Sequence, residues 1–546
     1  MRFLLQARSA FALMANIRSA TATAMHSVGA KDDCTAADAD NLPVVVVGGG
    51  LAGLAASIEA SRAGATVALM EKGNRIGGNS AKATSGINGA LTAAQKGTGA
   101  PDSIAAFTAD IIKSGGGRSN PELVDVLAQR STEAVEWLET FGLDLSLLSQ
   151  CGGHDAPRTH RIPPGADGRP VPVGWTTVQK VYKYVEDHPE EISVMTNAHV
   201  TSLTTDDAGK VTGVRYRQGG EGEDIDLPAA SVVLTTGGYA YDRSEGSLLS
   251  EFAPERLHLA TTSGPQATGD GVRLGQAAGA TLVDMDQVQI HPTSLVDPED
   301  QTNLSKFLAP EAMRGSGGIL VDAEGRRFAN ELTTRSVLTE AIFKAGAPIK
   351  GGKKVEETEG IAPTVAYLLL DQEAADAFGP GVLGFYMSKG LVRRAENAAE
   401  AAQMMRHDDA SVLTATLEAY TEAANGKRAD DFGKTVFPSK EFLATEPLYI
   451  SIITPAIHYT MGGVRIDSEG RALGELAGDG GDASPIPGLF AAGEVTGGVH
   501  GVNRLAGNSL LECVVIGRLA GQHAGAEAVA KAERCSQASG DGAGEL

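Results

Sequence analysis

A strand, a glycine turn and a helix follow one another directly near the start of the chain. Four valines at 44–47 predict a buried strand, and the alanine-rich stretch after the turn predicts a helix to about residue 63. Gly48 allows the tight turn, Gly50 leaves room for a pyrophosphate against backbone N–H groups, and Gly53 lets the helix pack on the strand. The helix N-terminus would stabilise the negative charge. This pattern predicts an α/β, Rossmann-like dinucleotide-binding fold.

A second strand strengthens this prediction. Residues 66–70 read as a strand that ends at Glu71, where a carboxylate can accept hydrogen bonds from ribose hydroxyls. Lys72 follows directly and is a further candidate contact. An acid in this place disfavours a 2′-phosphate, so the dinucleotide is expected to be NAD or FAD.

Three segments far apart in the chain favour FAD. Residues 75–86 form a glycine-rich arm suited to an extended cofactor and its isoalloxazine ring. Residues 231–236 read as a short strand with two glycines after it, and residues 488–494 read as a strand that delivers a carboxylate to the ribityl chain. The candidate cofactor contacts on these segments are Asn79, Ser80, Ser85, Gly86, Thr236, Gly237 and Glu494.

Size and charge limit the possible partners. With 546 residues and 42% hydrophobic content, the chain is expected to form two lobes around a cleft. The net charge of −22 disfavours binding to nucleic acid or anionic membrane, so an anionic substrate needs a local cationic pocket. No stretch reaches the roughly 18 uncharged apolar residues of a membrane span. We therefore expect no integral membrane segment.

The cysteines and histidines exclude several redox centres. The four cysteines contain no C-x-x-C pair and no C-x-x-C-H motif, so we predict neither an iron–sulfur cluster nor attached haem. No metal site is expected, because no histidine has a second ligand at suitable spacing. Electrons must therefore enter from another molecule.

Four longer stretches carry a family resemblance. They are GGNSAKATSGING (77–89), RGSGGILVDAEGRRFANELTTR (314–335), HYTMGG (458–463) and GEVTGGVHGVNRLAGNSL (493–510). Over residues 42–528 the chain resembles the fumarate reductase and succinate dehydrogenase flavoprotein family, particularly its soluble single-subunit members of the yeast and kinetoplastid type. Relatives with covalent flavin carry a histidine on the early arm. This chain has Asn79 and Ser80 in that neighbourhood, so non-covalent FAD is expected.

The resemblance implies a Rossmann-like FAD-binding domain with an inserted α+β capping domain. Residues 42–284 and 460–530 are expected to form the FAD-binding domain. Residues 285–459, which include an expected helix at 411–424, would form the capping domain. Residues 531–546 end in a stretch rich in glycine, serine and alanine and are expected to be a disordered tail.

The first 30 residues differ in composition from the rest. Residues 1–30 carry three arginines, several serines and alanines, and no acid, as an organelle-import leader would. A signal peptide and a plain disordered tail are the alternatives. We expect a mitochondrial location, with the endoplasmic reticulum, another organelle and the cytoplasm as alternatives.

The resemblance also implies a site for two carboxylates. Gln289 and His291 match the family's Q-x-H-P segment, whose histidine contacts one carboxylate. His458 matches the histidine that binds the other carboxylate, and Arg504 matches the arginine that clamps it, which suits a planar guanidinium. Gly507 lies where the backbone of the family touches substrate.

Arg335 matches the proton donor of the family, and Glu311 and Arg314 match the other members of its proton relay. An arginine normally stays protonated in proteins, so this role requires concerted proton loss and rapid reprotonation from Glu311. The alternative is a buried ion network that only orients substrate. Many relatives have Thr or Ser before the relay glutamate, whereas Pro310 has neither a hydroxyl nor an N–H.

The remaining candidate contacts surround the flavin. Asn508 begins an apolar helix whose N-terminal dipole would favour an anionic reduced flavin, and an ordinary capped core helix is the alternative. His154 and His160 resemble the family's pattern near the flavin, although a structural turn fits equally well, and His500 is a candidate for shaping the pocket. Further candidate cofactor contacts are Asp270, Tyr459, Ser509 and Leu510.

Together these features predict FAD-dependent reduction of fumarate to succinate, with hydride from flavin N5 and a proton from Arg335. The electron donor is expected to be soluble, such as reduced flavin or a reductase, because the sequence has a single dinucleotide fingerprint. Alternatives are a related flavin reductase or oxidase of urocanate, methacrylate, L-aspartate or a steroid ketone, a succinate dehydrogenase subunit, and a flavin electron acceptor in a thiol-oxidation pathway.

Overall fold

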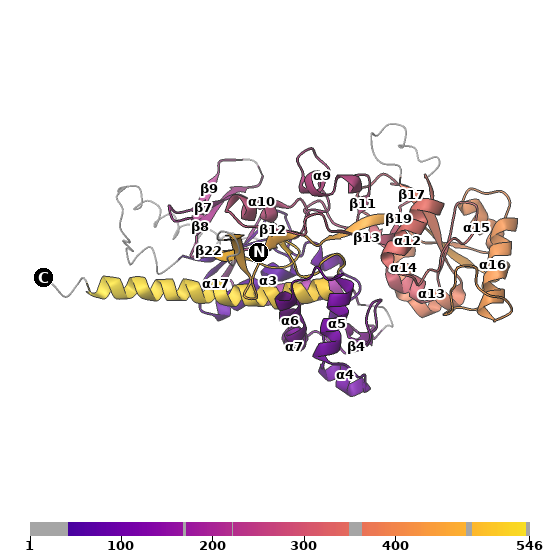
Figure 1. The fold of residues 1–546 in the computed structure, drawn as a ribbon, viewed down its shortest axis with the longest axis horizontal. Coiled ribbons are helices and arrows are strands. Elements are labelled where there is room, and N and C mark those ends of the chain that lie inside the picture. The colour runs from indigo at the N-terminus through magenta and orange to yellow at the C-terminus, as the bar shows by residue number, and fades with distance from the viewer. Residues whose placement is uncertain (1–41, 167–170, 221, 349–362, 477–482, 542–546) are drawn as a thin grey trace.

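The computed structural model describes residues 42–166, 171–220, 222–348, 363–476 and 483–541 (Figure 1). The expected leader at residues 1–30 lies outside these ranges. No helix in the described ranges is long and apolar enough to cross a membrane.

Within the described residues, a six-stranded sheet forms the base of the first lobe, in the order β21-β22-β10-β1-β2-β6. Its strands are β1 (Val44–Val47), β2 (Val67–Glu71), β6 (Ile192–Thr196), β10 (Ser231–Leu234), β21 (Arg471–Leu476) and β22 (Ala483–Ala491). β1 pairs in parallel with β2 and β10, and all residues of these three strands are buried, as expected for an α/β sheet covered on both faces. The predicted Rossmann-like α/β fold is confirmed.

Helices α3 (Leu51–Arg62) and α17 (Asn508–Asp541) pack along each other beside this sheet (Figure 1). The prediction that residues 531–546 form a disordered tail was wrong for residues 531–541, because α17 continues to Asp541. Residues 526–534 are mainly alanine, glutamate, lysine and arginine, which are strong helix formers. Residues 542–546 lie outside the described part.

An eight-stranded sheet organises the described part of the second lobe. Its strands are β11 (Ala260–Thr261), β13 (Val288–Leu295), β14 (Phe307–Leu308), β15 (Ile319–Val321), β16 (Ala347–Pro348), β17 (Thr364–Leu370), β18 (Arg393–Ala395) and β19 (Leu448–Thr460). The main path is β14-β13-β19-β17-β15, and the other three strands pair with β19 or β17. β11 lies within the range that we assigned to the FAD-binding domain, but its backbone pairs with the long strand β19.

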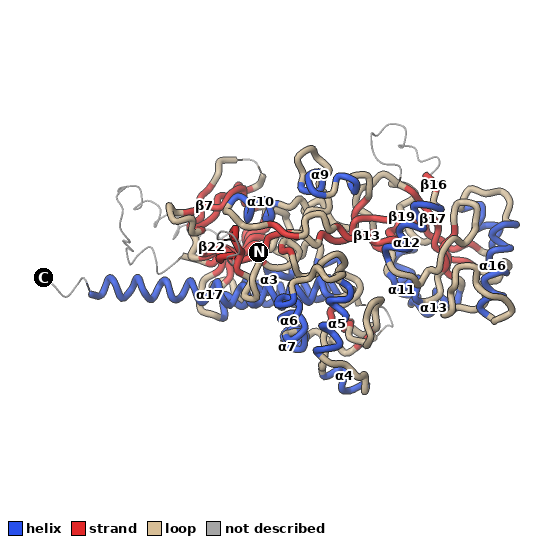
Figure 2. The backbone as a smooth tube through the Cα atoms, viewed as in Figure 1, coloured by secondary structure: helices blue, strands red, loops and turns tan. Residues whose placement is uncertain are grey.

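Helices cover both faces of this second sheet. They are α12 (Arg335–Ala345), α13 (Gln372–Phe378), α14 (Pro380–Ser388), α15 (Ala398–Met404) and α16 (Ser411–Ala424). Tyr367 and Leu369 of β17 join a core with α15 and α16, whereas Leu368 and Leu370 join a core with α12, α13 and α14. Figure 2 shows strands between these helix groups. The bounds of α16 confirm the helix predicted at 411–424.

Smaller elements complete both lobes. The other helices are α4 (Ala93–Thr98), α5 (Ile104–Ser114), α6 (Pro121–Gln129), α7 (Ser131–Glu139), α8 (Val173–Asp187), α9 (Leu248–Phe252), α10 (Asp270–Ala277) and α11 (Glu311–Gly315). The other strands are β3 (Ile87–Asn88), β4 (Leu147–Ser149), β5 (Thr159–Arg161), β7 (Ala198–Thr205), β8 (Val211–Gln218), β9 (Ile225–Pro228), β12 (Leu282–Val283), β20 (Gly463–Arg465) and β23 (Thr496–Gly497).

Candidate active site

A cavity of about 670 Å³ lies where the first sheet, the glycine-rich arm and the second lobe meet. The β1–α3 turn, the ends of β10 and β22 and the start of α17 line it. The candidate cofactor contacts that line it are Gly48, Gly50, Glu71, Lys72, Asn79, Ser80, Ser85, Gly86, Thr236, Gly237, Asp270, Tyr459, Glu494, Ser509 and Leu510. The fold thus brings together residues from both ends of the chain around one cavity.

Gly53 lies behind this cavity, at the contact between helix and strand. A Cβ on Gly53 would lie 1.9 Å from the carbonyl oxygen of Gly48, so the turn cannot keep its shape with any other residue there. Glu71 accepts hydrogen bonds from the N–H groups of Gly49 (2.9 Å) and Gly73 (2.7 Å). Its carboxylate therefore braces the turn at the end of β2 and also lines the cavity.

We expect Gly53→Ala to abolish dinucleotide binding, because the added methyl group displaces the β1–α3 turn. The measurement is the flavin-to-protein absorbance ratio after purification. Gly97→Ala is the matched control, since a Cβ at that helical glycine would meet nothing within 4 Å. A full flavin complement in Gly53→Ala would contradict this prediction.

Lys72 and Asp270 form an ion pair at the cavity wall, with 2.7 Å between Nζ and Oδ2. Lys72 also donates to Thr268, and His199 Nε2 lies 3.4 Å from the same carboxylate. Burial alone would raise the pKa of Asp270, but His199 and Lys72 outweigh it and hold that pKa far below its usual range. Asp270 is therefore ionised, and its charge is balanced within the protein.

Glu494 is half-buried at the cavity wall. Its Oε1 accepts hydrogen bonds from the backbone N–H (3.0 Å) and the hydroxyl (3.2 Å) of Thr460. Burial raises the pKa of Glu494 to about 7 despite these bonds. The residue that we predicted beside the ribityl chain can thus hold a proton near neutral pH.

This raised pKa makes stability depend on pH. The Glu494 carboxyl ionises near pH 4.5 when unfolded but keeps its proton to about pH 7 when folded. Unfolding releases that proton, so the free energy of unfolding falls as pH rises through this window. In protein prepared without flavin, we expect Glu494→Gln to remove this decline of roughly 3 kcal/mol. Urea unfolding at about pH 5 and about pH 8 measures it, and an equal decline in the variant would contradict the assignment.

His291 and His458 face each other on neighbouring strands, with ring centroids 5.5 Å apart. His458 Nδ1 hydrogen-bonds with Thr262 Oγ1 (2.8 Å), and His291 Nδ1 contacts the backbone of Thr293. Burial lowers the pKa of both rings, and nearby Arg335 lowers both further. Both histidines are therefore neutral donors or acceptors. His458 lines the cavity, whereas His291 lies behind it.

Arg504 also lines the cavity, and its guanidinium lies over the Tyr459 ring, 4.7 Å from the centroid. The Tyr459 hydroxyl donates to Glu512 (2.7 Å), which also pairs with His500 (2.9 Å). Sequence reasoning missed Glu512. The signal was present, since Glu512 is an acid within an apolar helical run. These contacts fix the ring on which Arg504 rests.

Gln289 contacts the loop that carries Arg504, and its predicted contact with substrate stays a prediction. Its Nε2 donates to Asn503 Oδ1 (2.6 Å) and to the Arg504 carbonyl (3.2 Å), and its side chain does not line the cavity. Gln289 therefore supports the backbone of the Arg504 loop. Gly507, by contrast, lines the cavity beside Arg504.

Arg335, Glu311 and Arg314 come together at the edge of the second lobe. Arg335 Nη2 lies 3.1 Å from Glu311 Oε2, and Arg335 begins helix α12. Burial alone would raise the pKa of Glu311, but Arg335 and Arg314 outweigh it and lower that pKa. Glu311 is thus an ionised carboxylate between two guanidinium groups. None of the three lines the cavity.

A second ion cluster supports Arg314 and was missed by sequence reasoning. Arg314 Nη1 donates to the Glu331 carbonyl (2.5 Å). The Glu331 carboxylate in turn pairs with Arg327 and with Lys434 (both 2.8 Å). Lys434 lies 103 residues from Glu331 in the chain, so the sequence carries no local signal for this cluster.

Several cationic donors near the cavity have no protein acceptor. In the described chain, Arg335 Nη1, Arg504 Nε, and Arg314 Nε and Nη2 are buried without a hydrogen-bond partner. Each unpaired buried donor has a desolvation cost, which an anion can offset. In a chain of net charge −22, these unpaired donors are cationic groups that can pair with an anion, and Arg504 is the one among them that lines the cavity.

Comparison with known proteins agrees with this geometry. A family model described as FAD binding domain matches residues 43–510. Fumarate reductase of Schizosaccharomyces pombe is 40% identical over 490 residues, which cover 89% of this chain and 90% of that protein. Fumarate reductase 1 of Saccharomyces cerevisiae is also 40% identical over 490 residues, covering 88% of this chain and 98% of that protein.

Among solved structures, the open conformation of a flavocytochrome c3 fumarate reductase matches with a TM-score of 0.73 and 32% identity. The match covers 90% of this chain and 79% of that chain. Fold and site define an FAD-dependent oxidoreductase that acts on a CH–CH bond. The chain belongs to the fumarate reductase flavoprotein family.

Proposed function

We propose that this protein reduces fumarate to succinate. The observation that carries the proposal is the group of donors from separate segments beside the FAD cavity, above all His458 and Arg504, with Arg335 close enough to affect both. Bound FAD supplies a hydride from N5. The similarity to yeast fumarate reductases over most of both chains supports the same activity.

In this proposal the protein holds a carboxylate at each end of the substrate. Arg504 and His458 bind one carboxylate, and His291 contacts the other. His291 Nδ1 lies 2.9 Å from the Thr293 carbonyl oxygen and 3.2 Å from the Thr293 nitrogen. A hydrogen bond from Nε2 of the neutral ring to the carboxylate therefore requires the tautomer in which Nδ1 accepts from the Thr293 N–H and does not donate to the carbonyl. Two fixed ends keep the double bond in one orientation beside the flavin.

Arg335 would deliver the proton to the second carbon. Its pair with Glu311 gives it a partner that can return a proton, and Arg314 completes the path. Because Arg335 lies close enough to affect His458 and Arg504, which line the cavity, we also propose that the segment 285–459 acts as a capping domain that closes over substrate. The alternative is that the three residues form a fixed ion network that only orients substrate. Because both roles use the same contacts, mutation of Arg335 is needed to distinguish them.

Pro310 is a feature that affects substrate preference. It precedes Glu311 at the start of α11 and supplies neither a hydroxyl nor an N–H. A hydrogen bond lost to a charged group is worth about 1.5–3 kcal/mol. We propose that the carboxylate near His291 is held less firmly, which favours tolerance of related unsaturated acids.

The electron donor is proposed to be a separate molecule such as reduced flavin or a reductase, because the chain encodes no haem or iron–sulfur motif. A mitochondrial location stays a prediction from the composition of residues 1–30.

Anaerobic oxidation of reduced flavin by the purified protein tests the proposal. Fumarate, urocanate and methacrylate are offered in parallel, and we expect fumarate to be much the best acceptor with many turnovers per protein. A preference for another acid would contradict the substrate assignment. A single stoichiometric reoxidation would instead indicate an electron carrier in a thiol-oxidation pathway.

A further inference from the structure

The peptide between Ala506 and Gly507 is held from one side at the edge of the cavity. Its carbonyl oxygen accepts hydrogen bonds from His154 Nε2 (2.8 Å) and Asn88 Nδ2 (2.7 Å). The peptide is trans, so the N–H of Gly507 points away from these two donors. Gly507 lines the cavity with Arg504, and within the described residues its N–H donates to no protein acceptor. The peptide therefore presents a backbone donor to the cavity.

The contact with Ala506 determines which nitrogen of His154 carries the proton. A carbonyl oxygen can only accept, so Nε2 must be the protonated nitrogen. Nδ1 then accepts from Arg158 Nη1, 3.3 Å away. Burial lowers the pKa of His154, which keeps the ring neutral. Arg158 thus favours the tautomer of His154 that can hold the carbonyl.

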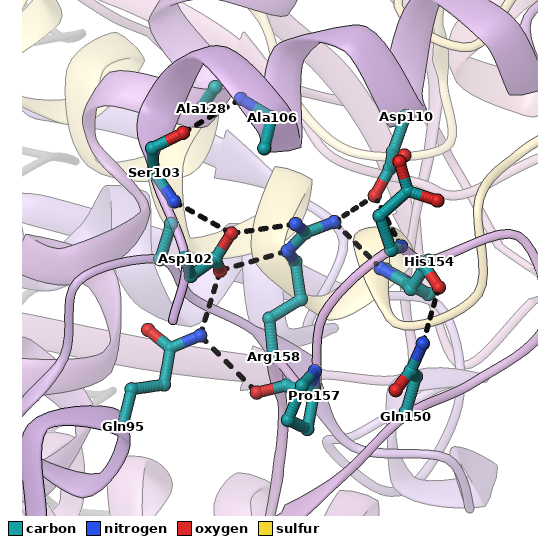
Figure 3. A network of polar contacts seen from close by, with 12 residues as sticks. Gln95, Asp102, Ser103, Ala106, Asp110, Ala128, Gln150, His154, Pro157 and Arg158 are labelled. Atoms are coloured by element: carbon teal, nitrogen blue, oxygen red, sulfur yellow. Dashed lines mark hydrogen bonds and ion pairs between the residues drawn. The ribbon is translucent and has the colours of Figure 1, made fainter. Parts of the chain in front are cut away.

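Arg158 is itself fully buried. Figure 3 shows its guanidinium bound by Asp102 on one side and Asp110 on the other. Asp102 accepts from its Nη2 (2.7 Å) and Nε (3.0 Å), and Asp110 forms a second ion pair. The guanidinium also lies over the Phe107 ring, 4.9 Å from the centroid. A bidentate carboxylate and an aromatic face leave a guanidinium little freedom to rotate.

Asn88 constrains the same peptide from β3. Its Oδ1 accepts from Thr159 Oγ1 (2.7 Å), and its Nδ2 also contacts Asn508 Oδ1 (2.6 Å). Gly507 has φ +84°, and a Cβ there would lie 2.2 Å from Asn88 Oδ1. Only glycine allows the backbone to approach Asn88 this closely.

We propose that His154 and Arg158 are positioning residues, which orient the Ala506–Gly507 peptide so that its N–H donates to a substrate carboxylate. The inference rests on the proposed function, because it requires a carboxylate in the cavity. Donors bound to the carbonyl polarise the peptide and strengthen its N–H as a donor. A contact made equally in the bound substrate and the transition state lowers KM without raising kcat.

Two substitutions of His154 test this role in the FAD-loaded protein. His154→Phe removes the donor to Ala506, whereas His154→Gln keeps an amide N–H that can reach the carbonyl. With fumarate we expect KM to rise about 10-fold in His154→Phe and mostly to return in His154→Gln. We expect kcat to stay within about twofold of wild type in both variants.

The matched control is His188→Phe, which removes a half-buried histidine that contacts the Tyr184 carbonyl at 2.7 Å and does not line the cavity. Flavin content and melting temperature are measured for every variant. A merely structural role would lower the melting temperature and leave the KM of the folded protein unchanged.

An unchanged KM in folded His154→Phe would overturn the inference, and so would an equal rise in His154→Gln. If His154→Phe does not fold, Asp110→Asn is used to test the inference. This change weakens the ion pair with Arg158 and changes the shape of the side chain little. A KM rise of about threefold would then support the inference, and an unchanged KM would overturn it. Absence of fumarate turnover in the wild type would overturn the proposed function instead. In that case the inference is tested by comparing the fumarate affinities of the same variants, measured by calorimetry.

Discussion

Arg335→Gln is expected to lower fumarate turnover by about 10²- to 10⁴-fold while leaving FAD bound. The amide cannot deliver a proton, and Glu311 loses the guanidinium 3.1 Å from its Oε2. FAD is retained because Arg335 does not line the cofactor cavity. Rapid anaerobic reoxidation of the reduced enzyme by fumarate measures the chemical step, and the flavin spectrum reports the cofactor.

Arg326→Gln is the matched control for this experiment. It removes an arginine from the same lobe whose side chain is 58% exposed and whose contact with Glu324 is long, at 3.9 Å. Near-normal turnover in Arg335→Gln would show that Arg335 belongs to an ion network that only orients substrate, and another group would have to supply the proton.

Arg504→Gln is the second change for which we expect a large effect. The variant leaves one substrate carboxylate in a buried pocket with His458, whose low pKa keeps it neutral. Loss of one member of a buried charge pair costs about 3–5 kcal/mol, which corresponds to a fall in kcat/KM of about 10²- to 10⁴-fold. Steady-state kinetics with fumarate measure this fall, and we expect most of it in KM.

Arg518→Gln controls for the loss of a largely buried arginine. Arg518 lies over the Trp137 ring at 5.6 Å, much as Arg504 lies over Tyr459, but it is on α17 away from the cavity. We expect Arg518→Gln to lower the melting temperature without changing kcat/KM. Equal kinetic effects of the two variants would argue against a carboxylate contact at Arg504.

Local features of the chain were predicted well from the sequence. The strand at Val44–Val47, the helix after it and helix α16 were correct because their hydrophobic period, glycines and length lie within one short segment. The prediction of a disordered tail was wrong because it relied on the composition of the last residues alone. The final glycines and serines suggested disorder, while alanine, lysine and glutamate just before them carry α17 on to Asp541.

The site was predicted only in part. The motifs that resemble the family indicated His458, Arg504 and Gly507, which line one cavity in the structure. The same motifs predicted a substrate contact for Gln289, which no observation tests, and gave no sign that its amide nitrogen holds the Arg504 loop. Glu512 had a local signal that we did not use, as the one acid in an apolar stretch of helix.

The sequence by itself determined the cofactor class, because a strand, glycine turn, helix and terminal acid form a contiguous pattern whose steric demands can be read locally. Only the tertiary structure brings Arg335 close to Arg504 and His458 of the cavity wall. It also links Asp102, Asp110 and Arg158 through His154 to the Ala506 carbonyl. These contacts join residues from distant parts of the chain. Burial and charge pairing stabilise these contacts jointly in the folded protein, so no short segment of the sequence predicts them.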